Sequence, residues 1–129
     1  GHIKDDWRKY QIIDTPGLLD REFDKRNAIE KQAVLALRYL TDVMLFVIDP
    51  SESCGFPREM QERLLATIKD SFTGVTIIEA ESKADIMKTG GDRICFSAQS
   101  GENMDILTGR ILEELRYIAR RKAAEAQIE

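Results

Sequence analysis

The hydrophobic pattern divides the chain into short apolar runs and longer amphipathic stretches. Residues 43–48 contain no polar position, and such a run predicts a strand of a parallel sheet covered by helices on both faces. Residues 75–80 and 94–96 are further, mostly apolar runs of strand length. Residues 3–13 predict a hairpin, because a polar pair separates two strand-like segments. The pattern thus predicts a hairpin followed by three buried strands.

Three stretches repeat their apolar residues every three or four positions, as one face of a helix requires. They cover residues 27–41, the segment from Pro57 to about Lys69, and residues 103 to about 125. The expected buried positions of the last two stretches are Met60, Leu64, Leu65 and Ile68, followed by Met104, Leu107, Ile111, Leu115 and Ile118. Beyond Arg120 the sequence is polar and alanine-rich, so we expect this end to project into solvent or fray.

The order of these elements predicts an α/β fold, a three-layer domain with a mostly parallel sheet and helices on both faces. The 129 residues are enough for one domain with its own core. In such sheets the ligand crevice lies beyond the carboxyl ends of the strands. The polar candidates for function gather at these ends: Asp14 to Gly17, Asp49, Ser82 to Asp85, and Ser97 to Gln99.

Composition indicates a soluble, globular chain, because 43% of its residues are hydrophobic and 33% are charged. The formal net charge of −4 provides no broad basic field, so we do not expect DNA as a partner. A local basic cluster lies on the last predicted helix and consists of Arg116, Arg120, Arg121 and Lys122. It is either a solvated helix face or a surface for RNA, and the pattern leaves both open.

Other candidate residues lead to no catalytic or metal site. Cys54 and Cys95 form neither a disulfide framework nor a Cys-x-x-Cys pair, so we expect free thiols in a cytoplasmic protein. We expect Cys54 to be a small buried residue. Glu79 and Glu81 alternate around Ala80 and are expected to face solvent rather than form a catalytic pair. The longest apolar run is too short to cross a bilayer, so no membrane partner is expected.

The tetrapeptide Asp14-Thr15-Pro16-Gly17 follows the second strand of the predicted hairpin and opens a polar loop. A carboxylate there can hold Mg²⁺ through a water molecule, and a glycine lets a backbone N–H approach a terminal phosphate. We therefore take Asp14, Thr15 and Gly17 as candidate nucleotide-binding residues, with Asp14 also serving Mg²⁺. The same residues also form an ordinary turn, and that alternative stays open.

Two later loops carry groups that fit a guanine base. A carboxylate at Asp85 can accept from N1–H and the exocyclic amine of guanine, a donor pair that adenine lacks. The stem of Lys83 can lie along the purine face, and the backbone N–H of Ala98 can point at guanine O6. The candidate base-binding residues are Ser82, Lys83, Asp85, Ser97, Ala98 and Gln99. Asp85 is alternatively a helix N-cap or a surface acid.

In chain order, the three loops match the third, fourth and fifth motifs of a GTPase domain. Longer strings resemble the nucleolar GTP-binding protein family, which comprises ribosome-assembly GTPases related to the Obg group. These strings are Asp14-Thr15-Pro16-Gly17-Leu18-Leu19-Asp20-Arg21, Arg26-Asn27-x-Ile29-Glu30-x-Gln32-Ala33, and Asp49-Pro50-Ser51-Glu52-x-Cys54-Gly55. The resemblance implies a G-domain fold, GTP or GDP with Mg²⁺ as ligands, and a precursor of the large ribosomal subunit or its RNA as partner. It also implies a nucleolar location in a eukaryote.

The chain departs from the family pattern in two ways. Ser82 stands where the family has asparagine, and a hydroxyl is too short to brace both the base and the neighbouring loops. Moreover, none of the 129 residues forms a Gly-x-x-x-x-Gly-Lys-Ser/Thr loop, which holds phosphates in this fold. We therefore expect a partial P-loop GTPase domain, spanning residues 1–129, that lacks the first strand and the phosphate-binding loop. GTP hydrolysis is expected of the parent protein and not of this chain alone.

The absent strand would lie between residues 10–13 and residues 43–48, and its absence exposes two strand edges. Three outcomes are open. The two strands close up directly, another chain fills the gap through self-association, or the chain is a fragment of a longer protein, which is the outcome we expect. A second hypothesis for function is a non-catalytic module that binds protein or ribosomal RNA.

Overall fold

The computed structural model describes residues 2–5, 8–11, 32 and 36–128. Its elements are β1 (His2–Asp5), β2 (Arg8–Gln11), η2 (Leu37–Tyr39), β3 (Val43–Ile48), α2 (Arg58–Ser71), β4 (Thr76–Glu81), β5 (Ile94–Cys95) and α3 (Met104–Ile128). The candidate residues Asp14, Thr15 and Gly17 lie outside the described residues, and so does most of the predicted helix 27–41. The described end of that stretch is the 3₁₀ turn η2.

The three later strands form one parallel sheet in the order β3-β4-β5, which confirms the predicted parallel arrangement. Val43 is paired with Thr76 at one end of β3, and Ile48 is paired with Glu81 at the other. β1 and β2 form the predicted antiparallel hairpin as a separate two-stranded sheet. Over the described residues β2 and β3 are not paired with each other, but part of the predicted strand 10–13 lies outside the described residues, so the three outcomes stay open.

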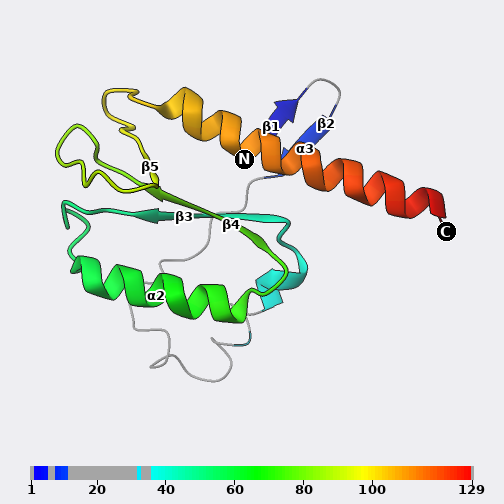
Figure 1. Ribbon diagram of the computed structural model, residues 1–129, viewed down its shortest axis with the longest axis horizontal. Coiled ribbons are helices and arrows are strands. Elements are labelled where there is room, and N and C mark those ends of the chain that lie inside the picture. The colour runs from blue at the N-terminus through cyan, green and yellow to red at the C-terminus, as the bar shows by residue number, and fades with distance from the viewer. Residues whose placement is uncertain (1, 6–7, 12–31, 33–35, 129) are drawn as a thin grey trace.

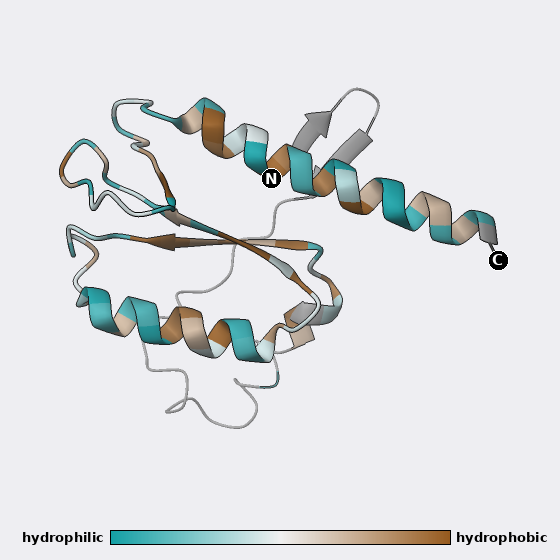
Figure 2. Cartoon of the chain, in the orientation of Figure 1, coloured by the Kyte–Doolittle hydropathy of each residue, from teal (hydrophilic) through white to brown (hydrophobic). Residues whose placement is uncertain are grey.

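Helices α2 and α3 lie on opposite faces of the sheet and complete the three predicted layers (Figure 1). Beneath the sheet, one cluster buries Leu64, Ile68 and Phe72 of α2 and its C-terminal end against apolar side chains of β3 and β4. On the α3 side, Leu107 packs with Ala80 and Phe96. Figure 2 shows that β3 and β4 are mostly hydrophobic and that α2 and α3 are mixed, as one-sided burial of the helices requires.

Helix α2 differs from its predicted boundaries and buried face at three positions. Pro57 is its N-cap rather than part of its first turn, with φ at −59° and ψ at 145°. The backbone N–H of Arg58 donates to Glu52 Oε2 at 2.5 Å, so a preceding carboxylate caps the helix. Met60 is only half-buried, whereas Gln61 beside it is 1% exposed. The buried position is therefore polar, which apolar periodicity does not detect.

Helix α3 continues to Ile128 and does not fray at Arg120. Leu107 is buried and Ile111 is half-buried on the predicted inner face, whereas Met104 is 36% exposed. Residues 120–127 are exposed but remain helical, so the expected projection into solvent is confirmed. No helix in the part of the chain that the structure describes is both long and apolar enough to cross a bilayer.

An ion cluster joins α2 to β4 and to the segment before β5. The guanidinium of Arg93 donates to Glu62 at 2.6 and 2.8 Å, to Glu79 at 3.0 Å and to Glu81 at 3.2 Å. Glu81 is only 2% exposed and also accepts from Arg58 Nη2 at 3.3 Å. The expectation that Glu81 faces solvent is therefore wrong, because two guanidinium groups compensate its burial.

Candidate functional site

The loops that follow β3, β4 and β5 are joined to one another at the carboxyl edge of the sheet. The backbone N–H of Ser82 donates to the carbonyl of Ile48 at 2.8 Å, which ties the loop after β4 to the end of β3. The N–H of Ala84 donates to the carbonyl of Phe96 at 3.0 Å, which ties the same loop to the segment after β5. The predicted convergence of these loops is thus confirmed for the described residues.

Asp85 and Ser97, two of the candidate residues, are in direct contact. Ser97 is fully buried, and its hydroxyl donates to Asp85 Oδ1 at 2.7 Å while it accepts from the N–H of Ser100 at 3.0 Å. The carboxylate of Asp85 is exposed, and each of its oxygens has more than one lone pair. A buried hydroxyl therefore fixes the direction of an exposed carboxylate that can still accept from a ligand.

Asp85 is not a helix N-cap. The described residues contain no helix between β4 and β5. Instead, Asp85 lies in a turn in which the N–H groups of Ile86 and Met87 donate to the carbonyl of Lys83 at 2.8 and 2.9 Å. Of the two structural alternatives, only the surface acid remains, and its contact with Ser97 distinguishes it from an ordinary one.

Lys83 has a left-handed backbone conformation, with φ at 60°. Its ammonium lies 3.7 Å from Asp49 Oδ2, and its side chain is 42% exposed. The neighbouring Ser82 hydroxyl donates to the carbonyl of Ile48 at 3.3 Å. The hydroxyl thus braces β3, and whether it can also reach the base stays a prediction.

The loop after β5 is closed by its own backbone bonds. The N–H of Ser97 donates to the carbonyl of Glu102 at 3.0 Å, and the N–H of Gly101 donates to the carbonyl of Ser97 at 2.8 Å. Ala98 and Gln99 are exposed at the outer part of this loop. Its backbone is therefore held in one conformation on the same edge as Asp85.

The loop after β3 contains the most distinctive string in the sequence, and its centre is the carboxylate of Asp49. Burial opposes ionisation of this group, but hydrogen bonds from Ser51 and Cys54 and the charge of Lys83 outweigh it and hold its pKa below the ordinary value. Cys54 itself is exposed, so the expectation that it is a buried residue is wrong. Its N–H is nevertheless bound to Asp49 Oδ2 at 2.9 Å.

Sequence reasoning missed Gln61, the residue that fastens this loop to α2. Gln61 Oε1 accepts from the N–H of Asp49 at 2.7 Å, and Nε2 donates to the carbonyls of Asp49 and Phe56, each at 3.0 Å. An isolated polar residue in the apolar face of a helix was the available signal. A buried amide that satisfies three backbone groups is costly to remove.

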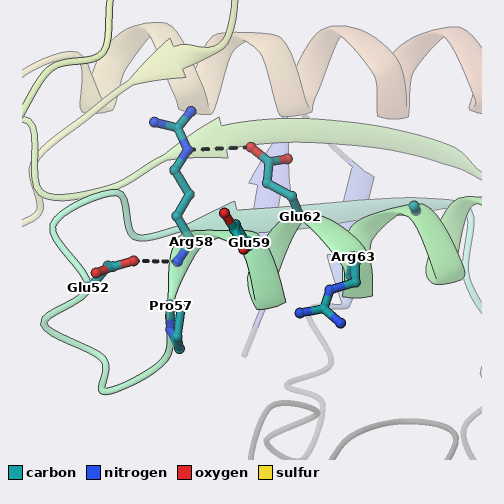
Figure 3. A pocket seen from close by; sticks show the side chains of 7 residues that line it. Glu52, Pro57, Arg58, Glu59, Glu62 and Arg63 are labelled. Atoms are coloured by element: carbon teal, nitrogen blue, oxygen red, sulfur yellow. Dashed lines mark hydrogen bonds and ion pairs between the residues drawn. The ribbon is translucent and has the colours of Figure 1, made fainter.

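A large open pocket lies away from these loops, along the N-terminal part of α2. Its volume is about 910 Å³, and its lining consists of Glu52, Pro57, Arg58, Glu59, Glu62, Arg63 and Ala66. Figure 3 shows Glu52 and Glu62 both directed towards Arg58, one at its backbone and one at its side chain. None of the candidate nucleotide-binding residues lines this pocket, so it is not the site predicted from the motifs.

The metal prediction depends on Asp14, which lies outside the described residues. Within the described ranges, no three His, Cys, Asp or Glu side chains gather in a group that could hold a metal ion. The Mg²⁺ assignment therefore stays a prediction from sequence.

A parallel sheet between two helical layers, with Asp85 and the 97–99 loop on one edge, has the architecture of an α/β domain of the P-loop GTPase type. A family model for nucleolar GTP-binding protein 1 matches residues 28–85. A crystal structure assigned to nucleolar GTP-binding protein 1 of Plasmodium falciparum superimposes with a TM-score of 0.76 at 31% identity, covering 98% of this chain and 74% of that one. The chain belongs to the nucleolar GTP-binding protein 1 family.

Curated relatives come from both archaea and eukaryotes. An uncharacterized protein of Methanocaldococcus jannaschii is 52% identical over 77 residues, which is 60% of this chain and 22% of the relative. Nucleolar GTP-binding protein 1 of Arabidopsis thaliana is 33% identical over 129 residues, which is 100% of this chain and 17% of the relative. The chain therefore spans less than a quarter of the length of these curated relatives.

Proposed function

We propose that this chain supplies the guanine-recognition part of a GTP-binding domain. The observation that carries the proposal is the 2.7 Å hydrogen bond from the buried Ser97 hydroxyl to the exposed carboxylate of Asp85. A carboxylate held in a fixed direction can accept from N1–H and the exocyclic amine of guanine with little loss of side-chain entropy. The relatives' names, which include the words GTP-binding, support the same ligand.

The other base-binding candidates have supporting roles in this proposal. The stem of Lys83 lies along the purine face, and the exposed backbone of Ala98 supplies an N–H for guanine O6. Ser82 orients the loop through β3 instead of contacting the base. Gln99 lies beside Ala98 on the exposed part of the loop.

The phosphate and magnesium parts of the proposal depend on the sequence alone. Asp14, Thr15 and Gly17 are the residues that would approach the terminal phosphate, and Asp14 would hold Mg²⁺ through water, where the ion would neutralise phosphate charge. GTP hydrolysis is proposed only for a protein that also has a phosphate-binding loop, since these 129 residues contain no such sequence. A precursor of the large ribosomal subunit stays a prediction for the partner, as does a nucleolar location in a eukaryote.

The test replaces the Asp85 carboxylate, the proposed acceptor for the guanine base, by an amide that can also donate. In Asp85→Asn the amide should accept from N1–H less well and should donate to the extra carbonyl of xanthine. We expect the affinity ratio of guanosine to xanthosine diphosphate to fall roughly tenfold or more, since one paired polar contact is worth about 1–3 kcal/mol of discrimination between bases. The measurement is a fluorescence titration of the 129-residue chain with labelled forms of both nucleotides and Mg²⁺.

The matched control is Asp70→Asn, which removes the same charge from an exposed position on α2. It should leave the ratio unchanged. If Asp85→Asn also leaves the ratio unchanged, the assignment of Asp85 is wrong. If the unmodified chain binds neither nucleotide at high micromolar concentration, guanine recognition by this chain is wrong.

The basic cluster on α3 gives little support to the second hypothesis, a non-catalytic module that binds protein or ribosomal RNA. Lys122 is paired with Asp42 at 2.7 Å, and Arg121 lies 3.8 Å from Glu125 and over the ring of Tyr117. Arg121 and Lys122 therefore have acidic neighbours, which reduces the charge available for RNA phosphates. Self-association through the edge of β3 stays a prediction.

A further inference from the structure

The nucleotide motifs leave the loop of residues 49–56 without a role, although its string is the most distinctive in the sequence. The carboxylate of Asp49 organises this loop. It accepts from the N–H of Ser51 at 3.0 Å, from the Ser51 hydroxyl at 2.6 Å, and from the N–H of Cys54 at 2.9 Å. Its side chain is 9% exposed, so the carboxylate is held in the loop and is not a mobile surface group.

The backbone on which Asp49 stands is fixed just as firmly. Gln61 binds both the N–H and the carbonyl of Asp49, at 2.7 and 3.0 Å, from a position that is 1% exposed. It also binds the carbonyl of Phe56 at the far end of the loop. Both ends of the loop are therefore attached to α2, and the Asp49 carboxylate has a defined position relative to the sheet.

One oxygen of this carboxylate faces the base-binding loop. Asp49 Oδ2 lies 3.7 Å from the ammonium of Lys83. The other end of that lysine is also held, because the N–H of the preceding Ser82 donates to β3 at 2.8 Å. The four-carbon stem of Lys83 therefore runs from the backbone after β4 to the loop after β3 and is held at both ends.

We propose that Asp49 is a positioning residue for the nucleotide base, since it holds the Lys83 ammonium so that the lysine stem forms a platform for the purine. This inference rests on the proposed function, because the platform matters only if a purine binds beside Asp85. Asp49 acts through Lys83 and does not contact the base. Its loss should therefore weaken guanine and xanthine nucleotides by the same factor, whereas a change at Asp85 alters the preference between them.

The charge required for this role is present at neutral pH. Burial opposes ionisation of Asp49, but the donors from Ser51 and Cys54 and the charge of Lys83 lower its pKa below the ordinary value. The ion pair is only partly buried, so its effect on affinity is small but measurable. We expect a two- to fivefold loss of affinity when it is removed, which corresponds to about 0.4 to 1 kcal/mol.

The experiment is a double-mutant cycle on the 129-residue chain, with fluorescently labelled guanosine diphosphate as the probe. Asp49→Asn removes the charge from one partner, and Lys83→Met keeps the apolar stem but removes the charge from the other. Each change should reduce affinity two- to fivefold, and the double variant should lose no more than Lys83→Met alone. The ratio of guanosine to xanthosine diphosphate should stay unchanged in all three. Lys122→Met, which breaks the ion pair to Asp42, is the matched control and should bind as the unmodified chain does.

Four outcomes would overturn the inference. If Asp49→Asn weakens binding by the same factor in the Lys83→Met chain, Asp49 acts through the structure of its loop and not through the lysine. If either single change leaves affinity unaltered, the platform has no role. If circular dichroism shows that Asp49→Asn does not fold, the affinity of the Lys83→Met chain for guanosine diphosphate is the test. Unaltered affinity in that variant overturns the proposal. If the unmodified chain binds no guanine nucleotide, the proposed function fails first, and this inference fails with it.

Discussion

Replacing Arg93 by methionine should be among the more destabilising single changes at the partly exposed surface of this fold. Arg93 lies just before β5 and its side chain is 21% exposed. Three carboxylates accept from its guanidinium, those of Glu62, Glu79 and Glu81. The hydrogen bonds that Arg93 donates to Glu62 outweigh the opposing effect of burial and raise the pKa of Arg93 above its ordinary value. Methionine keeps most of the apolar volume and removes every one of these contacts.

The magnitude follows from the exposure of the three partners. Glu62 and Glu79 have side chains that are 36% and 25% exposed, and each of those pairs is worth about 0.5 kcal/mol. The side chain of Glu81 is only 3% exposed. The Glu81 carboxylate still accepts from Arg58 Nη2 at 3.3 Å and from Thr89 Oγ1 at 2.5 Å in the variant. Loss of its contact with Arg93 therefore lowers the free energy of unfolding by about 1–3 kcal/mol, which is less than the full penalty of a lone buried charge. The expected loss is about 2–4 kcal/mol in the free energy of unfolding.

The assay is urea unfolding at pH 7 followed by far-ultraviolet circular dichroism, with the slope checked for constancy so that the midpoint reports stability. Arg63→Met on α2 is the matched control, because that arginine is exposed, and it should change stability by about 0.5 kcal/mol or less. Adding Glu81→Gln to Arg93→Met should recover about 1 kcal/mol, since the amide removes a buried charge that has lost one of its two guanidinium partners. A loss below about 1 kcal/mol for Arg93→Met, or no recovery in the double variant, would refute the reasoning.

Two further predictions concern the loop after β5 and the dependence of stability on pH. Ser97→Ala removes the hydroxyl that donates to Asp85 and orients it. The preference for guanosine over xanthosine diphosphate should therefore fall by about two- to tenfold in the same fluorescence titration. An unchanged preference would show that Asp85 does not need this hydrogen bond. Hydrogen bonds from Arg93 and from Lys69 lower the folded-state pKa of Glu62 and Glu79, respectively, below the ordinary 4.5. Their stabilising effect is therefore present above about pH 5 and lost as the pH falls through the folded-state values, which urea unfolding between pH 3 and 6 measures; stability that rises on acidification would contradict it.

The sheet and the base loops could be predicted because local sequence determines them. An uninterrupted apolar run such as residues 43–48 fits a buried parallel strand. The residue types of Asp85 and Ser97 alone show that one side chain can accept hydrogen bonds and that the other can donate one. That they touch follows from topology, since adjacent parallel strands bring their carboxyl ends to one edge.

The errors share a different physical cause, which is that long-range partners decide whether a polar residue is buried. Gln61 is buried because a loop twelve residues earlier offers backbone groups to its amide. Glu81 is buried because Arg93, twelve residues later, supplies a guanidinium. Cys54 is exposed, although its backbone N–H is bound to Asp49. Such pairings leave no periodic signal in the local sequence.

The left-handed conformation of Lys83 connects the fold with the proposed base site. A residue with a β-carbon at φ 60° is disfavoured by about 1–2 kcal/mol, and glycine would avoid this cost. Glycine would also lack the ammonium that faces Asp49 and the stem that we propose as the purine platform. Backbone bonds from the residues on either side of Lys83, to Ile48 and Phe96, hold the strained conformation in place. Because both bonds join this loop to other parts of the chain, the protein itself holds the loop, and nucleotide binding should not require it to fold.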